Sequence, residues 1–178
     1  NIFLSWSGEV KLLDFGIAKV NNRLRHTEAG VIKGKLQYMS PEQITGVGVD
    51  SRSDLFSCGI CLYEMLAGEM AYRDSDALEL LERIRTATLT PIEQIRTDLA
   101  PSVIRLVNKA LAVDLPERFQ DGDAFAAELR TIRHQLFPDF TPSELGQYLS
   151  SIFDETPFYL EESLVDGSAH EQEDLDLS

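Results

Sequence analysis

The spacing of apolar residues changes once along the chain, from strand-like to helical. Residues 2–4 (Ile-Phe-Leu) and 10–13 (Val-Lys-Leu-Leu) are short runs typical of β-strands, and residues 5–8 (Ser-Trp-Ser-Gly) between them favour a turn. We therefore predict a hairpin. Residues 17–40 are basic and polar and show no sustained period, which predicts a long loop; loops of this length in compact domains are usually functional.

Beyond this loop the pattern becomes helical. Residues 53–68 are apolar nearly all round, which predicts a helix buried on every side. A more amphipathic helix follows, carrying Leu78, Leu81, Glu82 and Arg85.

Three more helices are predicted after residue 100. Pro101 stands at a first helical position, and Thr141-Pro142-Ser143-Glu144 is a capping box with proline in the first turn. The three apolar faces are Val103, Leu106, Val107, Ala110 and Leu111; then Phe125, Leu129, Ile132 and Leu136; then Leu145, Tyr148, Leu149, Ile152 and Phe153. We predict a mainly α fold with one short β-hairpin and five or six helices.

Charge separates a body from a tail. The 178 residues include 16 Lys and Arg against 30 Asp and Glu, for a net charge of −14. Residues 139–178 hold eleven of the acids and no Lys or Arg, so residues 1–138 carry a net charge of only −3. Residues 161–178 are acidic and serine-rich and are predicted to be disordered, with an acidic docking tail as the alternative. The charge argues against a nucleic-acid partner.

Composition excludes further classes. With 43% hydrophobic residues the chain can form a core, and two cysteines are too few for a disulfide scaffold and fit the cytoplasm. The longest apolar stretch, residues 55–67, contains Glu64 and is shorter than the roughly 20 residues of a membrane span. The chain begins at Asn1 without a methionine or signal peptide, so we expect a preceding segment.

A C-x-x-C pair lies inside the most apolar predicted helix. A redox dithiol requires exposed cysteines at a helix N-terminus, and a zinc site requires a second pair of ligands. Cys58 and Cys61 meet neither condition, so we predict that both are small, buried core residues.

Candidate chemistry begins with Asp14-Phe15-Gly16 at the end of the second predicted strand. A carboxylate there can face a metal ion, although an aspartate in a turn is the simpler alternative. Three more segments follow in order: residues 34–42 (Gly-Lys-Leu-Gln-Tyr-Met-Ser-Pro-Glu), residues 50–54 (Asp-Ser-Arg-Ser-Asp) and residues 114–119 (Asp-Leu-Pro-Glu-Arg-Phe).

In this order and spacing, the motifs resemble the C-terminal lobe of eukaryotic-like protein kinases, in particular the bacterial serine/threonine type. The resemblance implies a kinase C-lobe over residues 1–138, with the N-lobe absent and an activation segment over 14–42. Residues 139–160 would then be a C-terminal extension whose helix packs on the lobe or binds a partner, and residues 161–178 the acidic tail.

The resemblance also implies the ligands of a metal cofactor. Asn1 matches the asparagine that ends the catalytic loop, and Asp14 the aspartate of Asp-Phe-Gly; both bind Mg²⁺ in the family. Asp14, Phe15 and Gly16 would contact the ATP·Mg²⁺ cofactor. The catalytic aspartate would lie five residues before Asn1, so no catalytic residue is expected within these 178 residues.

Three further matches imply structural roles. Glu42 corresponds to the glutamate of Ala-Pro-Glu, with Ser40 in place of alanine, and Arg118 to the arginine that pairs with it. Asp54 corresponds to an aspartate that holds the catalytic loop by hydrogen bonds.

Regulation and substrate binding are expected in the segment 14–42. Thr27 lies among basic residues, and its phosphorylation could order the loop; an unmodified threonine is the alternative. Gly34, Lys35 and Tyr38 would belong to the substrate-binding loop. The family commonly has threonine where this chain has Lys35, which weakens any inference about substrate preference, but serine/threonine specificity is favoured.

We therefore predict part of a cytoplasmic serine/threonine protein kinase that transfers the γ-phosphate of ATP to a protein substrate. The isolated chain is expected to be inactive. The alternatives are a pseudokinase that acts as a binding or scaffolding module, and an unrelated helical interaction domain.

Overall fold

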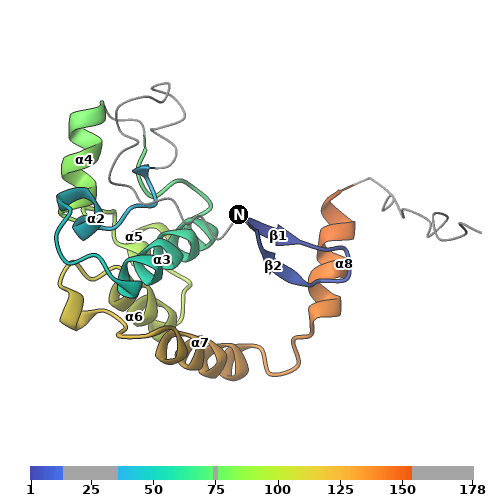
Figure 1. Cartoon of the computed structure of the whole chain (residues 1–178). Coiled ribbons are helices and arrows are strands. Elements are labelled where there is room, and N and C mark those ends of the chain that lie inside the picture. The colour runs from blue at the N-terminus through green and yellow to red at the C-terminus, as the bar shows by residue number, and fades with distance from the viewer. Residues whose placement is uncertain (14–35, 74–75, 154–178) are drawn as a thin grey trace, which may run out of the picture. The chain divides into compact units, whose positions relative to one another are not determined.

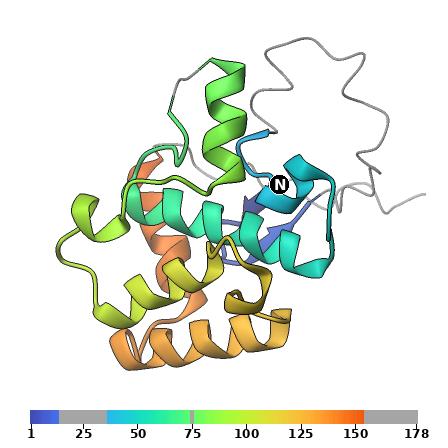
Figure 2. The same cartoon turned by 90° about the vertical axis from the view of Figure 1, so that its left-hand side faces the viewer.

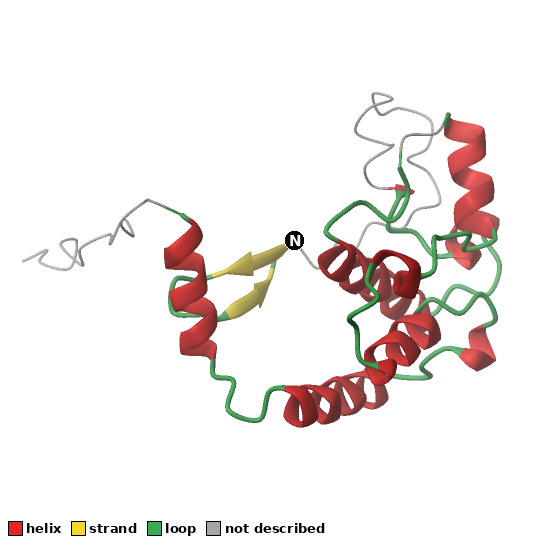
Figure 3. Cartoon of the chain, turned by 180° about the vertical axis from the view of Figure 1, so that it is seen from behind, coloured by secondary structure: helices red, strands yellow, loops and turns green. Residues whose placement is uncertain are grey.

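The computed structural model describes residues 1–13, 36–73 and 76–153 (Figure 1). It is mainly helical, with one small antiparallel sheet among these residues, as predicted (Figure 3). The chain divides into two compact units. Within the described residues, unit 1 comprises residues 1–13 and 140–153, and unit 2 comprises residues 36–73 and 76–139.

Unit 1 contains the predicted hairpin and one helix. Strands β1 (Ile2–Leu4) and β2 (Val10–Leu12) pair antiparallel with Ile2 opposite Leu12, and helix α8 (Pro142–Ile152) lies beside them (Figure 1). The capping box of α8 forms as predicted, because the Glu144 carboxylate accepts a hydrogen bond from the Thr141 N–H at 2.7 Å.

The turn between the strands is built by local hydrogen bonds. The Ser5 N–H donates to the Glu9 carbonyl at 2.9 Å, and the Ser5 hydroxyl oxygen accepts the Glu9 N–H at 2.9 Å. Gly8 has a φ of 81°, in the left-handed region where a residue without Cβ is unstrained.

The described regular secondary structure of unit 2 is entirely helical. Aspartate side chains start three of its helices: Asp50 accepts the Arg52 N–H, Asp76 the Leu78 N–H and Asp121 the Ala124 N–H. The elements are α2 (Pro41–Thr45), α3 (Ser51–Ala67), α4 (Ala77–Arg85), α5 (Ile92–Ile95), α6 (Pro101–Ala110), the 3₁₀ turn η2 (Leu115–Glu117) and α7 (Gly122–Leu136).

Helix α3 supplies much of the core of unit 2. Its Phe56 and Ile60 are fully buried, together with Tyr72, which follows the helix. Helix α6 packs against both α3 and α7 (Figure 2) and buries Leu106. Helices α2 and α5, with five and four residues, are too short to show an apolar period and were not predicted.

The prediction that the central helix is buried on every side is wrong. Asp54, Cys58 and Met65 are exposed and Cys61 is half-buried, so the two cysteines are not core residues. These residues share one helix face. Partial burial, and secondarily the nearby Asp54 carboxylate, raise the pKa of the Cys58 thiol, which disfavours the reactive thiolate.

On two other helices, only some of the residues predicted to form the apolar face are buried. On α7, Phe125 and Ile132 are buried, but Leu129 and Leu136 are exposed. On α8 the buried residues are Gly146 and Leu149, whereas Tyr148, Ile152 and Phe153 are exposed. The apolar spacing predicted both helices correctly, but it does not show which of their apolar side chains are buried by packing.

Among the described helices, none has both the length and the apolar character that crossing a bilayer requires.

Candidate functional site

The predicted metal ligands belong to the open end of the hairpin. The Leu13 N–H donates to the Asn1 carbonyl at 2.8 Å, which extends the ladder beyond the Ile2–Leu12 pair. Asn1 is exposed. Asp14, Phe15 and Gly16 lie outside the described residues, but Asp14 directly follows Leu13 in the sequence.

The donor set fits Mg²⁺, a hard cation that prefers oxygen ligands and is usually held by one or two carboxylates together with phosphates and water. Asn1 offers an amide oxygen and Asp14 a carboxylate. Among the described residues, no group of three His, Cys, Asp or Glu side chains could hold a metal ion by itself.

A buried ion pair joins two of the predicted site residues, 76 positions apart in the sequence. The Arg118 guanidinium donates to both oxygens of the Glu42 carboxylate, at 2.8 Å to Oε1 and 3.2 Å to Oε2. The arginine side chain is 0% exposed and the glutamate side chain 6%. This two-pronged geometry is the strong form of a charge-assisted hydrogen bond.

All five N–H groups of the Arg118 guanidinium have acceptors. Besides the two bonds to Glu42, the guanidinium donates to the carbonyl oxygens of Ala112 at 3.0 Å, Arg52 at 3.0 Å and Val113 at 3.3 Å. Its plane lies over the Phe56 ring, with the central carbon 4.9 Å from the ring centroid. One side chain thus ties the start of α3 and residues 112–113 to α2.

The Glu42 carboxylate stays ionised despite its burial. Burial alone would raise its pKa, but hydrogen bonds from Arg118 and from the Ser53 hydroxyl, which is 2.7 Å from Oε1, outweigh burial and lower the pKa. Sequence reasoning missed Ser53. The only signal for it was its position at the start of α3, in the same segment as Asp54.

A second arginine supports the same junction. The Arg52 guanidinium donates to Asp50 at 2.7 Å, to the Gln120 side-chain oxygen at 3.0 Å and to the Leu115 carbonyl at 3.3 Å. These contacts bind the start of α3 to the segment that contains Arg118. This second connection was not predicted from the sequence.

Tyr38 is held by α3. Its hydroxyl donates to Glu64 Oε2 at 2.8 Å, and its carbonyl accepts the Ser57 hydroxyl at 2.7 Å. Burial and the neighbouring Glu64 carboxylate raise the pKa of Tyr38 to about 12, so the hydroxyl remains a donor at neutral pH. The other oxygen of Glu64 accepts the Ala71 N–H at 2.9 Å.

The other predicted site residues are not brought to this cluster. Asp54 is exposed on α3, on the face that also carries Cys58. Thr27, Gly34 and Lys35 lie outside the described residues.

The buried Glu42–Arg118 pair and the ordered motifs define a protein of the kinase class. The sequence matches the protein kinase domain family over residues 1–130, so the chain belongs to this family. The predicted resemblance to bacterial serine/threonine kinases is confirmed by its relatives.

Three curated relatives illustrate this. The chain is 37% identical over 158 residues to the tyrosine-protein kinase MasK of Myxococcus xanthus, covering 89% of this chain and 24% of MasK. It is 33% identical over 155 residues to the serine/threonine-protein kinase PknL of Mycobacterium tuberculosis, covering 85% and 39% of the two chains. It is 34% identical over 142 residues to PknB of Mycolicibacterium smegmatis, covering 78% and 23%.

The chain therefore spans between about a quarter and two fifths of the length of these relatives. Protein kinases as a class use ATP with a divalent metal and phosphorylate protein hydroxyl groups.

Proposed function

We propose that this chain is the C-lobe part of a serine/threonine protein kinase, with residues 1–138 in the lobe and 14–42 as activation segment. The observation that carries the proposal is the buried, fully hydrogen-bonded Glu42–Arg118 pair, which joins two of the ordered kinase motifs in space. The kinase would transfer the γ-phosphate of ATP to a protein hydroxyl in the cytoplasm.

Asn1 and Asp14 would hold the Mg²⁺ ion through amide and carboxylate oxygens, and Phe15 and Gly16 would lie next to the nucleotide. The ion, when bound, neutralises charge on the transferred phosphoryl group. The contribution of this chain is positional, because the hairpin ladder holds Asn1 beside Leu13, the residue before Asp14.

The activation segment would contain the regulatory and substrate-binding residues. We assign Thr27 as its phosphorylation site, and Gly34, Lys35 and Tyr38 to the substrate-binding loop. The hydrogen bond between Tyr38 and Glu64 supports this assignment, because it ties the end of that loop to α3.

Activity would require residues beyond those of this chain. The catalytic aspartate, the lysine that contacts the phosphates and the glycine-rich loop would all come from a preceding segment, so we expect the 178 residues alone to be inactive. Residues 139–160 would form an extension and residues 161–178 an acidic tail open to a docking partner.

The test compares the 178-residue chain with a longer natural chain that includes the preceding segment. Each is incubated with labelled ATP, Mg²⁺ and a general protein substrate, and the labelled amino acids are identified. We expect label on serine and threonine with the longer chain only, and its loss in the Asp14→Asn variant.

Three outcomes would contradict the proposal. Phosphorylation by the 178 residues alone would show that they are sufficient. Label on tyrosine would place the protein with MasK, whose name describes a tyrosine kinase. A longer chain that binds a substrate protein without phosphorylating it would be a pseudokinase.

A further inference from the structure

The β1–β2 hairpin is too small to be stable without support. Each strand has three residues, and all six are exposed. A two-stranded hairpin of this size is at best marginally stable in water and requires packing against a helix or further strands. Yet its open end carries Asn1, which we assign to Mg²⁺, and Leu13, which precedes the second assigned ligand in the sequence.

Helix α8 provides this packing, through contact between two backbones. Gly8 in the turn and Gly146 in α8 are both buried. A Cβ at Gly8 would overlap the Pro142 carbonyl, and a Cβ at Gly146 would overlap the Trp6 carbonyl. Neither backbone can move aside easily, so the close approach depends on glycine at both positions.

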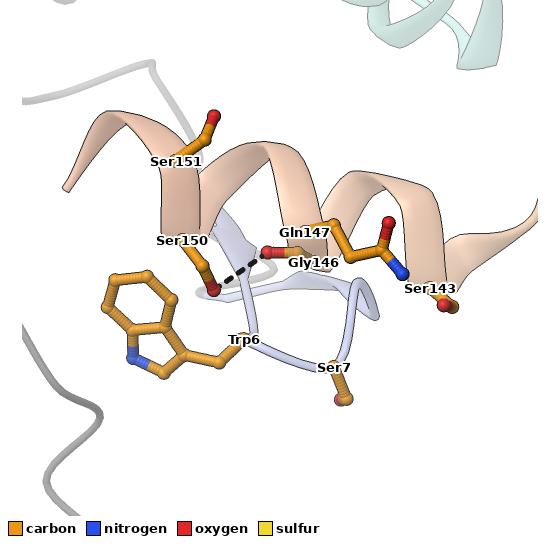
Figure 4. A pocket seen from close by; sticks show the side chains of 7 residues that line it. All are labelled: Trp6, Ser7, Ser143, Gly146, Gln147, Ser150 and Ser151. Carbon is orange, nitrogen blue, oxygen red and sulfur yellow. Dashed lines mark hydrogen bonds between the residues drawn. The ribbon is translucent and has the colours of Figure 1, made fainter.

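Aromatic and polar contacts surround the two glycines. The Trp6 and Phe153 rings meet edge to face, with their centroids 6.1 Å apart. Beside them is an open pocket of about 670 Å³, lined by serines, Gln147 and the Trp6 indole (Figure 4). Within it the Ser150 hydroxyl donates a hydrogen bond to the Gly146 carbonyl at 3.0 Å. The hydroxyl proton of this serine is therefore already used by the backbone of α8.

We propose that α8 positions the metal-binding hairpin, and that Gly146 is the residue on which this positioning depends. The proposal rests on the function proposed above. Helix α8 begins at residue 142, beyond residue 130, where the match to the kinase family ends. The match to the family model therefore does not include this helix.

The strand register connects the turn to the open end. With three residues in each strand, the position of the turn determines which residue lies opposite Asn1. A slip of one residue would move one strand by about 3.3 Å and reverse the faces of its side chains. Holding the turn against α8 thus fixes the pairing of Asn1 with Leu13 at the open end of the hairpin.

The first experiment uses the 178-residue chain and needs no kinase activity. Trp6 is the only tryptophan, so its fluorescence reports directly on this contact. In Gly146→Val we expect the Trp6 emission to shift to longer wavelength and the Leu13 amide to exchange roughly tenfold faster. Gly122→Val is the matched control, because a Cβ at Gly122 meets nothing within 4 Å. Phe153→Ala is a milder second variant, which removes only the ring contact.

The second experiment uses the longer chain and measures KM for Mg·ATP together with kcat. We expect kcat/KM to fall roughly tenfold in Gly146→Val, with KM raised and kcat lowered, because the misplaced ligands hold an ion that acts both on the bound nucleotide and on the transferred phosphoryl group. An unchanged kcat/KM in a variant with shifted Trp6 emission would overturn the positioning role alone. Unshifted emission and unchanged Leu13 exchange would overturn the α8 contact. Absence of Mg·ATP binding by the unaltered longer chain would instead refute the proposed function.

Discussion

At the scale of single residues, Arg118 combines full burial of its side chain with an acceptor for every guanidinium N–H group. A buried guanidinium is tolerated only when its charge is paired and its donors are satisfied, and Arg118 meets both conditions with five hydrogen bonds. The cost of dehydrating it is large, so the pair need not add stability compared with apolar residues. Removing only one partner, however, leaves the other charge buried without a counter-charge and lowers stability.

We predict that Arg118→Leu lowers the free energy of unfolding by about 3–5 kcal/mol, because the buried Glu42 carboxylate loses its partner. The measurement is urea unfolding followed by circular dichroism. The control is Arg85→Leu, which removes an exposed pair with Glu82 on α4 and should cost less than about 1 kcal/mol. Equal losses in the two variants would contradict a special role for the buried pair.

Acid should weaken the same pair. The folded pKa of Glu42 is lowered, so its contribution to stability is complete above the pKa of an unfolded glutamate, about 4.3, and is lost as the pH falls through the folded pKa. We expect the difference in unfolding free energy between the unaltered chain and Glu42→Gln to shrink from pH 7 to pH 3. A difference that stays constant or grows on acidification would disagree with a lowered pKa.

At the scale of elements, α3 and α6 approach each other closely at a glycine. A Cβ at Gly59 would lie 3.0 Å from the Ala110 Cβ and 3.0 Å from a Leu111 methyl group. Glycine within a helix usually costs stability compared with alanine. Here the small residue allows the central helix to pack against α6.

We predict that Gly59→Val destabilises the chain by about 1–3 kcal/mol, as expected for overpacking a core contact. Gly122→Val on α7 again serves as the control, since its added atoms meet open space. Urea unfolding of both variants checks the prediction. A loss in Gly122→Val as large as that in Gly59→Val would mean that helix propensity, rather than packing, explains the effect.

At the scale of the whole molecule, the chain forms two compact units instead of one. Unit 1 contains the only tryptophan, and all but one of the described helices belong to unit 2. Different optical signals therefore report on different units. A chain of this kind need not unfold in a single two-state transition.

We predict that Trp6 fluorescence and far-ultraviolet circular dichroism give different midpoints in urea. Gly146→Val should lower only the fluorescence midpoint, and Arg118→Leu only the dichroism midpoint, because each residue belongs to one unit. Superimposable transitions in the unaltered chain and in both variants would show that the units unfold together.

Much of this architecture could be predicted from the sequence because its signals are local. The hairpin, the longer helices and the capping box of α8 depend on neighbouring residues, and their patterns were interpreted correctly. The error at Cys58 and Cys61 has a physical reason. An apolar pattern shows that a face can be buried, but only the surrounding elements decide whether it is.

The sequence by itself determined the kinase family, through motifs whose order and spacing can be recognised without coordinates, and it indicated Asn1 and Asp14 as ligands. Only the tertiary structure decided which partners Arg118 has besides Glu42, and that Gly146 packs against the hairpin turn. These Arg118 hydrogen bonds and the Gly146 contact both involve backbone atoms whose contacts no sequence motif predicts. Such contacts form when segments distant in sequence are packed together, and the local sequence does not encode which carbonyl groups will then face a side chain.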